Sequence, residues 1–332
     1  MTYRVCTIEG DGIGHEVVPA AVRVLQATGV PFEFCPARAG WDCFKAVGAS
    51  LPADTLATVK CCNATLFGAN TSPAGKADGY RSPILTLRRE LGLFANLRPT
   101  QSWPITVSRA GIDLLIVREN TEDLYLGLEE SDGETAVAKR IITRGASARI
   151  VRLACELAMR RRRTLTLVHK ANVLRETCGL FRSAGYAVAA EFPELQVNDL
   201  FVDAMAMRLI KDPETFDVIV TTNLFGDILS AEAAALVGGL GLAPSGNVGG
   251  STAVFEPVHG SAPDIAGRGL ANPLAAILSA AMLLDYLHED AAAQRVHQAV
   301  RQVLQTGPWP PDLGGSAGTE QVTQAVEQLV LR

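Results

Sequence analysis

Two aspartates stand where strand-like segments give way to helical patterns: Asp203 in F-V-D-A-M-A-M and Asp227 in N-L-F-G-D-I-L-S. An aspartate at the start of a helix is a common cap, because its carboxylate accepts hydrogen bonds from free backbone amides. Two carboxylates that converge on one point instead favour a bound cation. A hard divalent ion such as Mg²⁺ takes oxygen ligands and leaves several positions to water and substrate. From these residues alone, helix capping and a metal site both stay open.

Three arginines lie near strand ends or in loops punctuated by glycine and proline. Arg88 and Arg98 occur in L-R-R-E-L-G-L-F-A-N-L-R-P, and Arg118 occurs in L-I-V-R-E-N-T-E. A guanidinium group is a planar fork that binds a carboxylate through two parallel hydrogen bonds. Each arginine alone is typical of a protein surface, but together the three predict a cluster that binds a carboxylate-bearing ligand.

A segment rich in small residues, H-G-S-A-P-D-I-A-G-R-G-L-A-N-P, covers residues 259–273. Small residues let the backbone approach a flat ligand closely. Within the segment, Asp264 could accept hydrogen bonds from a ribose diol and would repel a 2′-phosphate. A surface loop with an aspartate turn is the alternative. The G-x-G-x-x-G fingerprint of common dinucleotide-binding folds is missing, since the nearest stretch is Gly10-Asp11-Gly12-Ile13-Gly14.

The composition of the chain indicates which classes of protein it can belong to. The chain has 332 residues, 48% of them hydrophobic, and a formal net charge of −5, which argues against nucleic acid or an anionic membrane as the main partner. We expect no leader peptide and no membrane span, because no apolar run approaches about 20 residues. Seven cysteines without a C-x-x-C pair are typical of a reducing compartment. We therefore expect a cytoplasmic protein.

Strand-like and helical patterns alternate along the chain. Buried strands are predicted at 5–8, 65–68, 114–117, 165–168 and 218–220, and helices dominate after residue 273. This alternation predicts an α/β protein with a substantial parallel component. The more polar stretch 121–143 interrupts it and is interpreted as an excursion from the sheet, such as an arm for subunit contact.

Several motifs occur in one characteristic order: E-G-D-G-I-G-H-E, A-N-L-R-P, V-R-E-N-T-E, H-K-A-N-V-L, V-D-A-M-A-M, T-N-L-F-G-D-I-L-S and F-E-P-V-H-G-S-A-P-D-I-A-G. With them the chain resembles the β-decarboxylating dehydrogenases that act on isocitrate, isopropylmalate or homoisocitrate, and most of all the bacterial homoisocitrate-oxidising members. The resemblance implies an isopropylmalate dehydrogenase-like α/β fold with two open α/β domains, a mixed sheet and a dimer clasp, rather than a standard Rossmann fold. It implies a large NAD-binding domain at 1–97 plus 251–332, and a smaller inserted domain at 98–250 with a dimer arm at about 125–145.

The resemblance also implies an activity: NAD-dependent oxidative decarboxylation of homoisocitrate to 2-oxoadipate and CO₂ in lysine biosynthesis, with isocitrate as a second substrate. Tyr125 would be catalytic together with Lys170 of the partner subunit, and Asp227 with Asp203 of the partner subunit would hold Mg²⁺ or Mn²⁺. The alternatives are that Tyr125 is a core aromatic and that Lys170 is a surface cation. A homodimer with shared active sites is implied, and a tetramer stays possible.

The implied binding residues fall into two sets. The substrate set is Ser72, Arg81, Ile84, Leu85, Arg88, Arg98, Arg118, Asn172 and Val173. The cofactor set is Ile13, Thr71, His259, Gly260, Ser261, Ala262, Asp264, Ile265 and Asn272.

Three positions depart from the family pattern. Ala231 replaces the usual third acid of G-D-I-L-S-D, and Glu232 points about 100° away from that face of the helix, so we expect weaker metal binding. Leu85 stands where homoisocitrate-oxidising members present Arg, and the apolar pair Ile84 and Leu85 favours an isopropyl group. Asp123, where relatives usually have Gly, has no assigned role. The alternatives to homoisocitrate oxidation are therefore isopropylmalate oxidation and a catalytically weak regulatory subunit.

Overall fold

The computed structural model describes residues 2–73, 75 and 77–332. These residues form two compact units. Unit 1 comprises Met1–Gly92, Trp103–Arg109 and Gly238–Arg332, and unit 2 comprises Leu93–Ser102 and Ala110–Val237. The domain boundaries expected from the sequence, 97/98 and 250/251, remain a prediction.

The sheet of unit 1 has the strand order β2 (Phe32–Ala37), β1 (Tyr3–Gly10), β3 (Ala64–Ala69), β12 (Val254–Pro257) and β11 (Pro244–Val248). Strand β1 pairs in parallel with β2 and β3, β3 pairs in parallel with β12, and β11 is antiparallel to β12. Every residue of β3 is buried, as in a parallel strand that is covered on both faces.

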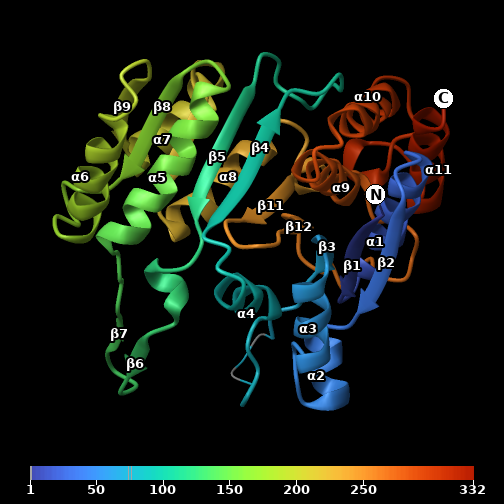
Figure 1. The fold of residues 1–332 in the computed structure, drawn as a ribbon, viewed down its shortest axis with the longest axis horizontal. Coiled ribbons are helices and arrows are strands. Elements are labelled where there is room, and N and C mark those ends of the chain that lie inside the picture. The colour runs from blue at the N-terminus through green and yellow to red at the C-terminus, as the bar shows by residue number, and fades with distance from the viewer. Residues whose placement is uncertain (1, 74, 76) are drawn as a thin grey trace. The chain divides into compact units, whose positions relative to one another are not determined.

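The helices of unit 1 lie beside this sheet or beyond the ends of its strands (Figure 1). They are α1 (Gly14–Ala27), α2 (Trp41–Val47), α3 (Ala53–Cys61), α4 (Pro83–Glu90), α9 (Leu274–Tyr286), α10 (Asp290–Thr306) and α11 (Thr319–Val330). Helix α1 buries an apolar face that includes Val17, Val24 and Leu25, and it packs against α9 and α11. Helix α9 is buried over most of its length, which explains why its sequence is apolar on all sides. Among the described residues, none of the helices could span a bilayer.

The sheet of unit 2 has the strand order β4 (Ala95–Gln101), β5 (Asp113–Glu119), β10 (Val218–Thr221), β8 (Thr164–His169) and β9 (Gln196–Phe201). Strand β4 runs antiparallel to β5, and the other pairs are parallel. Thr221 lies beside both Arg118 and Val168, so the carboxyl ends of β5, β8 and β10 meet at one edge. The expected α/β class with a mixed sheet is confirmed.

Four helices, α5 (Arg144–Met159), α6 (Thr177–Ala189), α7 (Val202–Lys211) and α8 (Asn223–Ala235), belong to unit 2 as described here. A short 3-10 turn, η1 (Asp123–Leu126), follows β5 and leads into a two-stranded antiparallel hairpin, β6 (Glu129–Ser131) and β7 (Ala136–Ala138). Figure 1 shows this hairpin extending away from the helices of its unit, and both of its strands are exposed. It lies within the predicted arm, whose part in subunit contact stays a prediction.

Candidate active site

Asp227 is the centre of a cluster of charged and polar side chains in unit 2. Helix α8 has Thr222 as its N-cap, so Asp227 lies in the second turn and the capping interpretation is wrong for this residue. Oxygen Oδ1 of Asp227 accepts hydrogen bonds from Arg98 Nη1 at 3.1 Å and Arg118 Nη1 at 2.5 Å. The hydroxyl of Tyr125 donates to Oδ2. The structure therefore brings together four of the predicted site residues.

The two arginines of this cluster are held rigidly by neutral side chains. Arg118 donates to Asn223 Oδ1 through Nε at 3.1 Å and Nη2 at 2.8 Å. Arg98 donates through Nε to Asn96 Oδ1 at 2.5 Å. Because Arg118 and Asn96 are cross-strand neighbours in the β4–β5 ladder, their side chains share one face of the sheet.

Helix α8 can approach these arginines only because it carries a glycine. A Cβ atom on Gly226 would lie 2.6 Å from Arg118 Cγ. Both guanidinium groups are buried, whereas 39% of the Asp227 side chain remains exposed. Buried cations that face a partly open carboxylate form a site suited to an anionic ligand and, beside it, a hard cation.

Tyr125 lies under Arg118, whose Cζ is 4.8 Å from the centre of the ring. Burial raises the pKa of the Tyr125 hydroxyl, and the hydrogen bond to Asp227 acts in the same direction, although Arg118 opposes both. The phenol is therefore protonated throughout the neutral range. A protonated phenol can donate a proton to a bound ligand.

Lys170 and Asp203 form a second, more open cluster in unit 2. Lys170 Nζ donates to Asp203 Oδ1 at 2.5 Å and lies 5.5 Å from the centre of the Phe201 ring. This hydrogen bond lowers the pKa of Asp203. Asp203 is in the first turn of α7, where a carboxylate suits the helix dipole, so part of the capping interpretation applies to it. The neighbouring Asn172 and Val173 are exposed.

Next to Lys170 along the chain, the buried His169 belongs to a polar network that the sequence analysis missed. His169 Nε2 is 2.9 Å from Asp199 Oδ2, and its Nδ1 accepts from the Ala171 amide. Burial lowers the pKa of His169, so the imidazole is neutral. Burial alone would raise the pKa of Asp199, but hydrogen bonds from Arg182, Tyr186 and His169 lower it to about 2. This network fixes the strand end that carries Lys170.

Arg88 and the predicted specificity residues belong to unit 1. Arg88, on α4, donates to Asn247 Oδ1 at 2.9 Å and Glu256 Oε1 at 3.2 Å. Ile84 and Leu85 are half-buried on the same helix, while Ser72 and Arg81 are exposed. Because Arg98 and Arg118 belong to unit 2, the three-arginine cluster stays a prediction.

The predicted cofactor residues of unit 1 meet around Ser261. The Ile13 amide donates to the Ser261 carbonyl at 2.9 Å, and Thr71 Oγ1 donates to Ser261 Oγ at 2.6 Å. A Cβ on Gly12 would lie 2.1 Å from the Ser261 carbonyl oxygen, so only glycine allows this approach. Asp11, which the sequence analysis did not single out, is almost fully buried and accepts hydrogen bonds from the amides of Trp41, Asp42 and Thr71.

His259 carries an unsatisfied group in this region. Its Nδ1 contacts the Gly260 carbonyl at 2.9 Å, but its Nε2 is buried and has no hydrogen-bond partner among the residues that the structure describes. Burial lowers the pKa of His259, so the ring is neutral. A buried nitrogen of this kind is suited to a polar atom of a ligand.

The loop that follows His259 is partly strained and mostly open. Ala262 has a φ of 38°, an unusual conformation for a residue with a side chain, and Gly260 and Asp264 are exposed. The Ile265 amide donates to the Ala262 carbonyl at 3.1 Å and closes a turn. Asn272 lies just before the N-cap of α9, and its Oδ1 accepts from the Leu274 amide at 3.0 Å.

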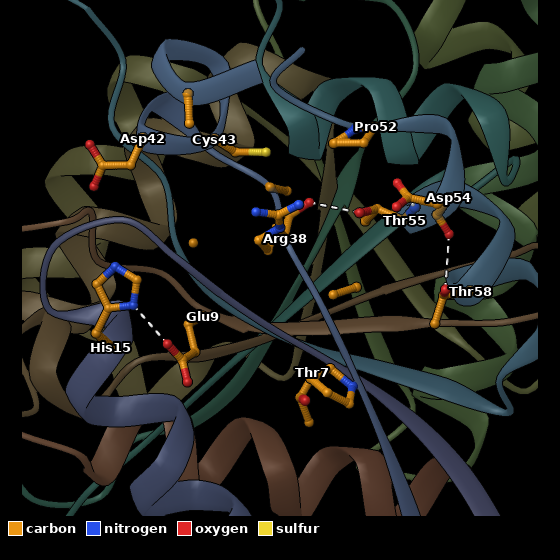
Figure 2. A pocket seen from close by; sticks show the side chains of 15 residues that line it. Thr7, Glu9, His15, Arg38, Asp42, Cys43, Pro52, Asp54, Thr55 and Thr58 are labelled. Atoms are coloured by element: carbon orange, nitrogen blue, oxygen red, sulfur yellow. Dashed lines mark hydrogen bonds and ion pairs between the residues drawn. The ribbon is translucent and has the colours of Figure 1, made fainter. Parts of the chain in front are cut away.

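A separate polar pocket of about 610 Å³ lies at the ends of β1 and β2. Figure 2 shows His15 paired with Glu9 on one side of it, and Arg38, Asp54 and Thr55 on the other. None of the predicted site residues lines this pocket. Among the described residues, no three His, Cys, Asp or Glu side chains form a metal-binding group, so Asp203 and Asp227 of one chain are not part of such a group.

The chain is similar to characterised proteins along nearly its whole length. It matches the family described as isocitrate/isopropylmalate dehydrogenase over residues 4–326. It is 59% identical, over 98% of both chains, to isocitrate/homoisocitrate dehydrogenase of Thermus thermophilus. It is 50% identical, again over 98% of both chains, to 3-isopropylmalate dehydrogenase of Methanothermobacter thermautotrophicus. The crystal structure of isocitrate dehydrogenase from Methylococcus capsulatus superposes with a TM-score of 0.96 at 43% identity, covering 99% of this chain and 100% of that one.

Proposed function

We propose that the chain oxidises and decarboxylates homoisocitrate with NAD⁺. The chain belongs to the isocitrate/isopropylmalate dehydrogenase family and is a decarboxylating dehydrogenase, and the proposal starts from this membership. The products are 2-oxoadipate and CO₂, and the reaction serves lysine biosynthesis. Isocitrate is a second substrate. The higher identity to the isocitrate/homoisocitrate enzyme than to the isopropylmalate enzyme supports this substrate class.

The observation that carries the proposal is the Asp227 cluster. Arg98 and Arg118 present two buried guanidinium groups, and Asp227 presents a half-exposed carboxylate between them. A substrate with adjacent carboxylate groups can replace Asp227 as the partner of the arginines, which frees Asp227 to bind a cation. Arg88 is proposed to complete this clamp from unit 1.

The donor set fits a divalent ion that is shared between two subunits. Asp227, together with Asp203 of the partner subunit, would hold Mg²⁺ or Mn²⁺, and substrate and water would supply the other oxygens. The cofactor set fits NAD⁺, because His259 Nε2 lacks a partner within the described part of the chain and Gly12 allows close packing against Ser261. When bound, NAD⁺ accepts the hydride of the substrate and the ion polarises the substrate oxygens.

Two side chains carry the proton transfers in this proposal, Tyr125 and Lys170 of the partner subunit. Lys170 helps to remove the proton of the substrate hydroxyl as its carbon is oxidised, and Asp203 orients the ammonium group. Tyr125 donates a proton to the carbon that loses its carboxyl group, and its raised pKa keeps it protonated for this role. The alternative roles are a surface cation for Lys170 and a core aromatic for Tyr125. Neither role gives a function to the hydrogen bonds that these residues make to aspartates.

A homodimer is part of the proposal. Helices α7 and α8 expose large apolar side chains, with Met207, Ile210 and Ile228 each more than half exposed, and the hairpin exposes Leu128 and Val137. Such an apolar face is typical of a surface that is buried in an oligomer. Sedimentation velocity should give a dimer or a tetramer, and a monomer at working concentration would contradict a shared site.

Isopropylmalate is the second candidate substrate. The half-buried apolar pair Ile84 and Leu85 on α4 favours it, because an apolar wall suits an isopropyl group and leaves a distal carboxylate without a cation. An assay of NADH absorbance with homoisocitrate, isocitrate and isopropylmalate, each with and without Mn²⁺, separates the candidates. We expect the highest kcat/KM with homoisocitrate and no turnover after chelation. A clear preference for isopropylmalate would overturn the substrate assignment, and turnover of none of the three would favour a regulatory subunit.

A further inference from the structure

Asp123 is a buried acid that has no place in the mechanism above. Its side chain is fully buried, and it opens η1, the turn that carries Tyr125. Its φ of 74° lies in the left-handed region, which glycine adopts most easily and which aspartate tolerates better than most residues. A fully buried carboxylate in this conformation needs strong partners.

Arg140 is the main partner of Asp123. Arg140 Nε donates to Asp123 Oδ1 at 2.6 Å, and Nη2 donates to Oδ2 at 3.3 Å. Burial acts to lower the pKa of Arg140, but the hydrogen bonds and the charge of Asp123 outweigh it and raise that pKa. The Arg140 guanidinium group is therefore charged at neutral pH where it faces the Asp123 side chain.

The pair joins the segments around the candidate site. Arg140 follows the hairpin, and its Nη2 also donates to Thr222 Oγ1, the N-cap residue of α8, at 2.8 Å. Its Nη1 is 3.0 Å from Cys178 Sγ at the start of α6, and its Cζ lies 4.8 Å from the centre of the Phe225 ring on α8. One guanidinium group thus ties the hairpin base to the starts of two helices.

Asp123 acts on α8 directly. Its Oδ2 accepts a hydrogen bond from the Leu224 amide at 3.2 Å, and its Oδ1 accepts from the Leu124 amide at 2.9 Å. The side chain of Thr222 makes no capping hydrogen bond to α8, so Asp123 supplies this cap from another segment. The negative charge also suits the positive end of the helix dipole.

Asp227 lies three residues after Leu224 on α8, and Tyr125 lies two residues after Asp123. We propose that the Asp123–Arg140 ion pair is a positioning device that fixes the start of α8 against η1 and so holds the Asp227 carboxylate against the Tyr125 hydroxyl. This inference rests on the proposed function, because it assigns the pair to the geometry of those two residues. It also gives a role to the aspartate that stands where the family usually has glycine.

The test compares Asp123 with a second buried aspartate of the same unit. Asp217 is almost fully buried, accepts from Arg161 Nε at 2.8 Å, and precedes β10 at the end opposite to Thr222. Asp123→Gly, Arg140→Met, the double variant and Asp217→Asn are assayed for kcat, for KM of NAD⁺ and for melting temperature. The left-handed backbone accepts glycine, so Asp123→Gly changes the side chain without straining the turn.

We expect both Asp123→Gly and Asp217→Asn to melt at lower temperature. Only Asp123→Gly should lose kcat, by about tenfold to a hundredfold, with KM of NAD⁺ unchanged. The double variant should recover melting temperature relative to Asp123→Gly, because no buried charge is left unpaired, but its kcat should stay low because α8 has lost its cap. Asp123→Asn should recover part of kcat, since an amide oxygen can still accept from Leu224.

A kcat of Asp123→Gly within twofold of the wild type would overturn the inference, as would an equal loss in Asp217→Asn. A wild-type protein without turnover on the three acids would contradict the proposed function instead. In that event a crystal structure of Asp123→Gly decides, because the inference requires the hydrogen bond between Tyr125 and Asp227 to be broken there and kept in Asp217→Asn.

Discussion

The two clusters of unit 2 differ in how completely their own chain supports them. Asp227 has three partners from three segments, and the guanidinium groups beside it are almost fully buried. The Asp203 side chain is 67% exposed. Among the described hydrogen bonds, the charged side chain that bonds to it is Lys170. The first cluster is preorganised by its own fold, whereas the second leaves its carboxylate largely exposed.

This difference fits a site assembled from two copies of the chain. A preorganised half can bind and orient a substrate without help. An exposed half gains its full environment only when another surface covers it. The exposed apolar residues Val173, Met207 and Ile210 follow Lys170 and Asp203 along the chain, as they would on a face that a second subunit buries.

The largest effects are expected for substitutions of Asp227 and Asp203, and the two variants should differ in stability. Asp227→Asn and Asp203→Asn should each lower kcat/KM by about a hundredfold or more, because each removes a proposed ligand of the ion. Only Asp227→Asn should also destabilise the fold, by about 1–3 kcal/mol, since it leaves two buried guanidinium groups without their anion. Urea unfolding of both variants measures this. Equal stability losses would remove the contrast between the clusters.

A smaller effect is expected at the two proposed proton-transfer residues. Lys170→Met and Tyr125→Phe should each lower kcat by about a hundredfold. A small primary alkylamine should restore part of the activity of Lys170→Met, because that cluster is open. It should not restore Tyr125→Phe, whose missing hydroxyl is buried beside Asp227 and is no amine. Failure of amine rescue over a range of amine sizes would argue against an open lysine site.

The class of fold could be predicted from local patterns, and the members of the Asp227 cluster could be predicted from the resemblance to a family. Buried strands read as apolar runs, and T-N-L-F-G-D-I-L-S places an acid on a helix. The side chains that hold the site residues in place could not be predicted. Asp123 and Arg140 are 17 residues apart and meet only because the hairpin returns to η1. Likewise, Asp199 meets His169 only because β8 and β9 are neighbours. No spacing rule in one sequence predicts such long-range pairs.

The polar network around His169 should have a pH-dependent stability. Because the pKa of folded Asp199 is about 2, below that of an unfolded aspartate, its ionised form stabilises the protein above the unfolded value. Asp199→Asn should therefore cost about 2 kcal/mol at pH 7, and the difference from wild type should shrink as pH falls from about 4 towards 2. Denaturant unfolding across this range tests it. A difference that is independent of pH would contradict the assigned ionisation.

The smallest effect is expected at Ala231, which is exposed one helical turn after Asp227. Ala231→Asp adds a carboxylate to that face of α8 and should tighten the activation constant for Mn²⁺ by about threefold to tenfold. Glu232→Gln is the matched control on the neighbouring face and should leave the constant unchanged. An unaltered Mn²⁺ requirement in Ala231→Asp would show that position 231 does not face the ion.

Assembly of the site from two subunits is tested most directly by subunit complementation. Lys170→Met and Asp227→Asn chains with different affinity tags are coexpressed, and the hybrid dimer is purified through both tags. In a shared site, one of the two sites of the hybrid combines the unchanged Asp227 of the Lys170→Met chain with the unchanged Lys170 of the Asp227→Asn chain. The hybrid should therefore have about half of the wild-type activity per dimer, while both parents are nearly inactive. A hybrid as inactive as its parents would contradict the shared site.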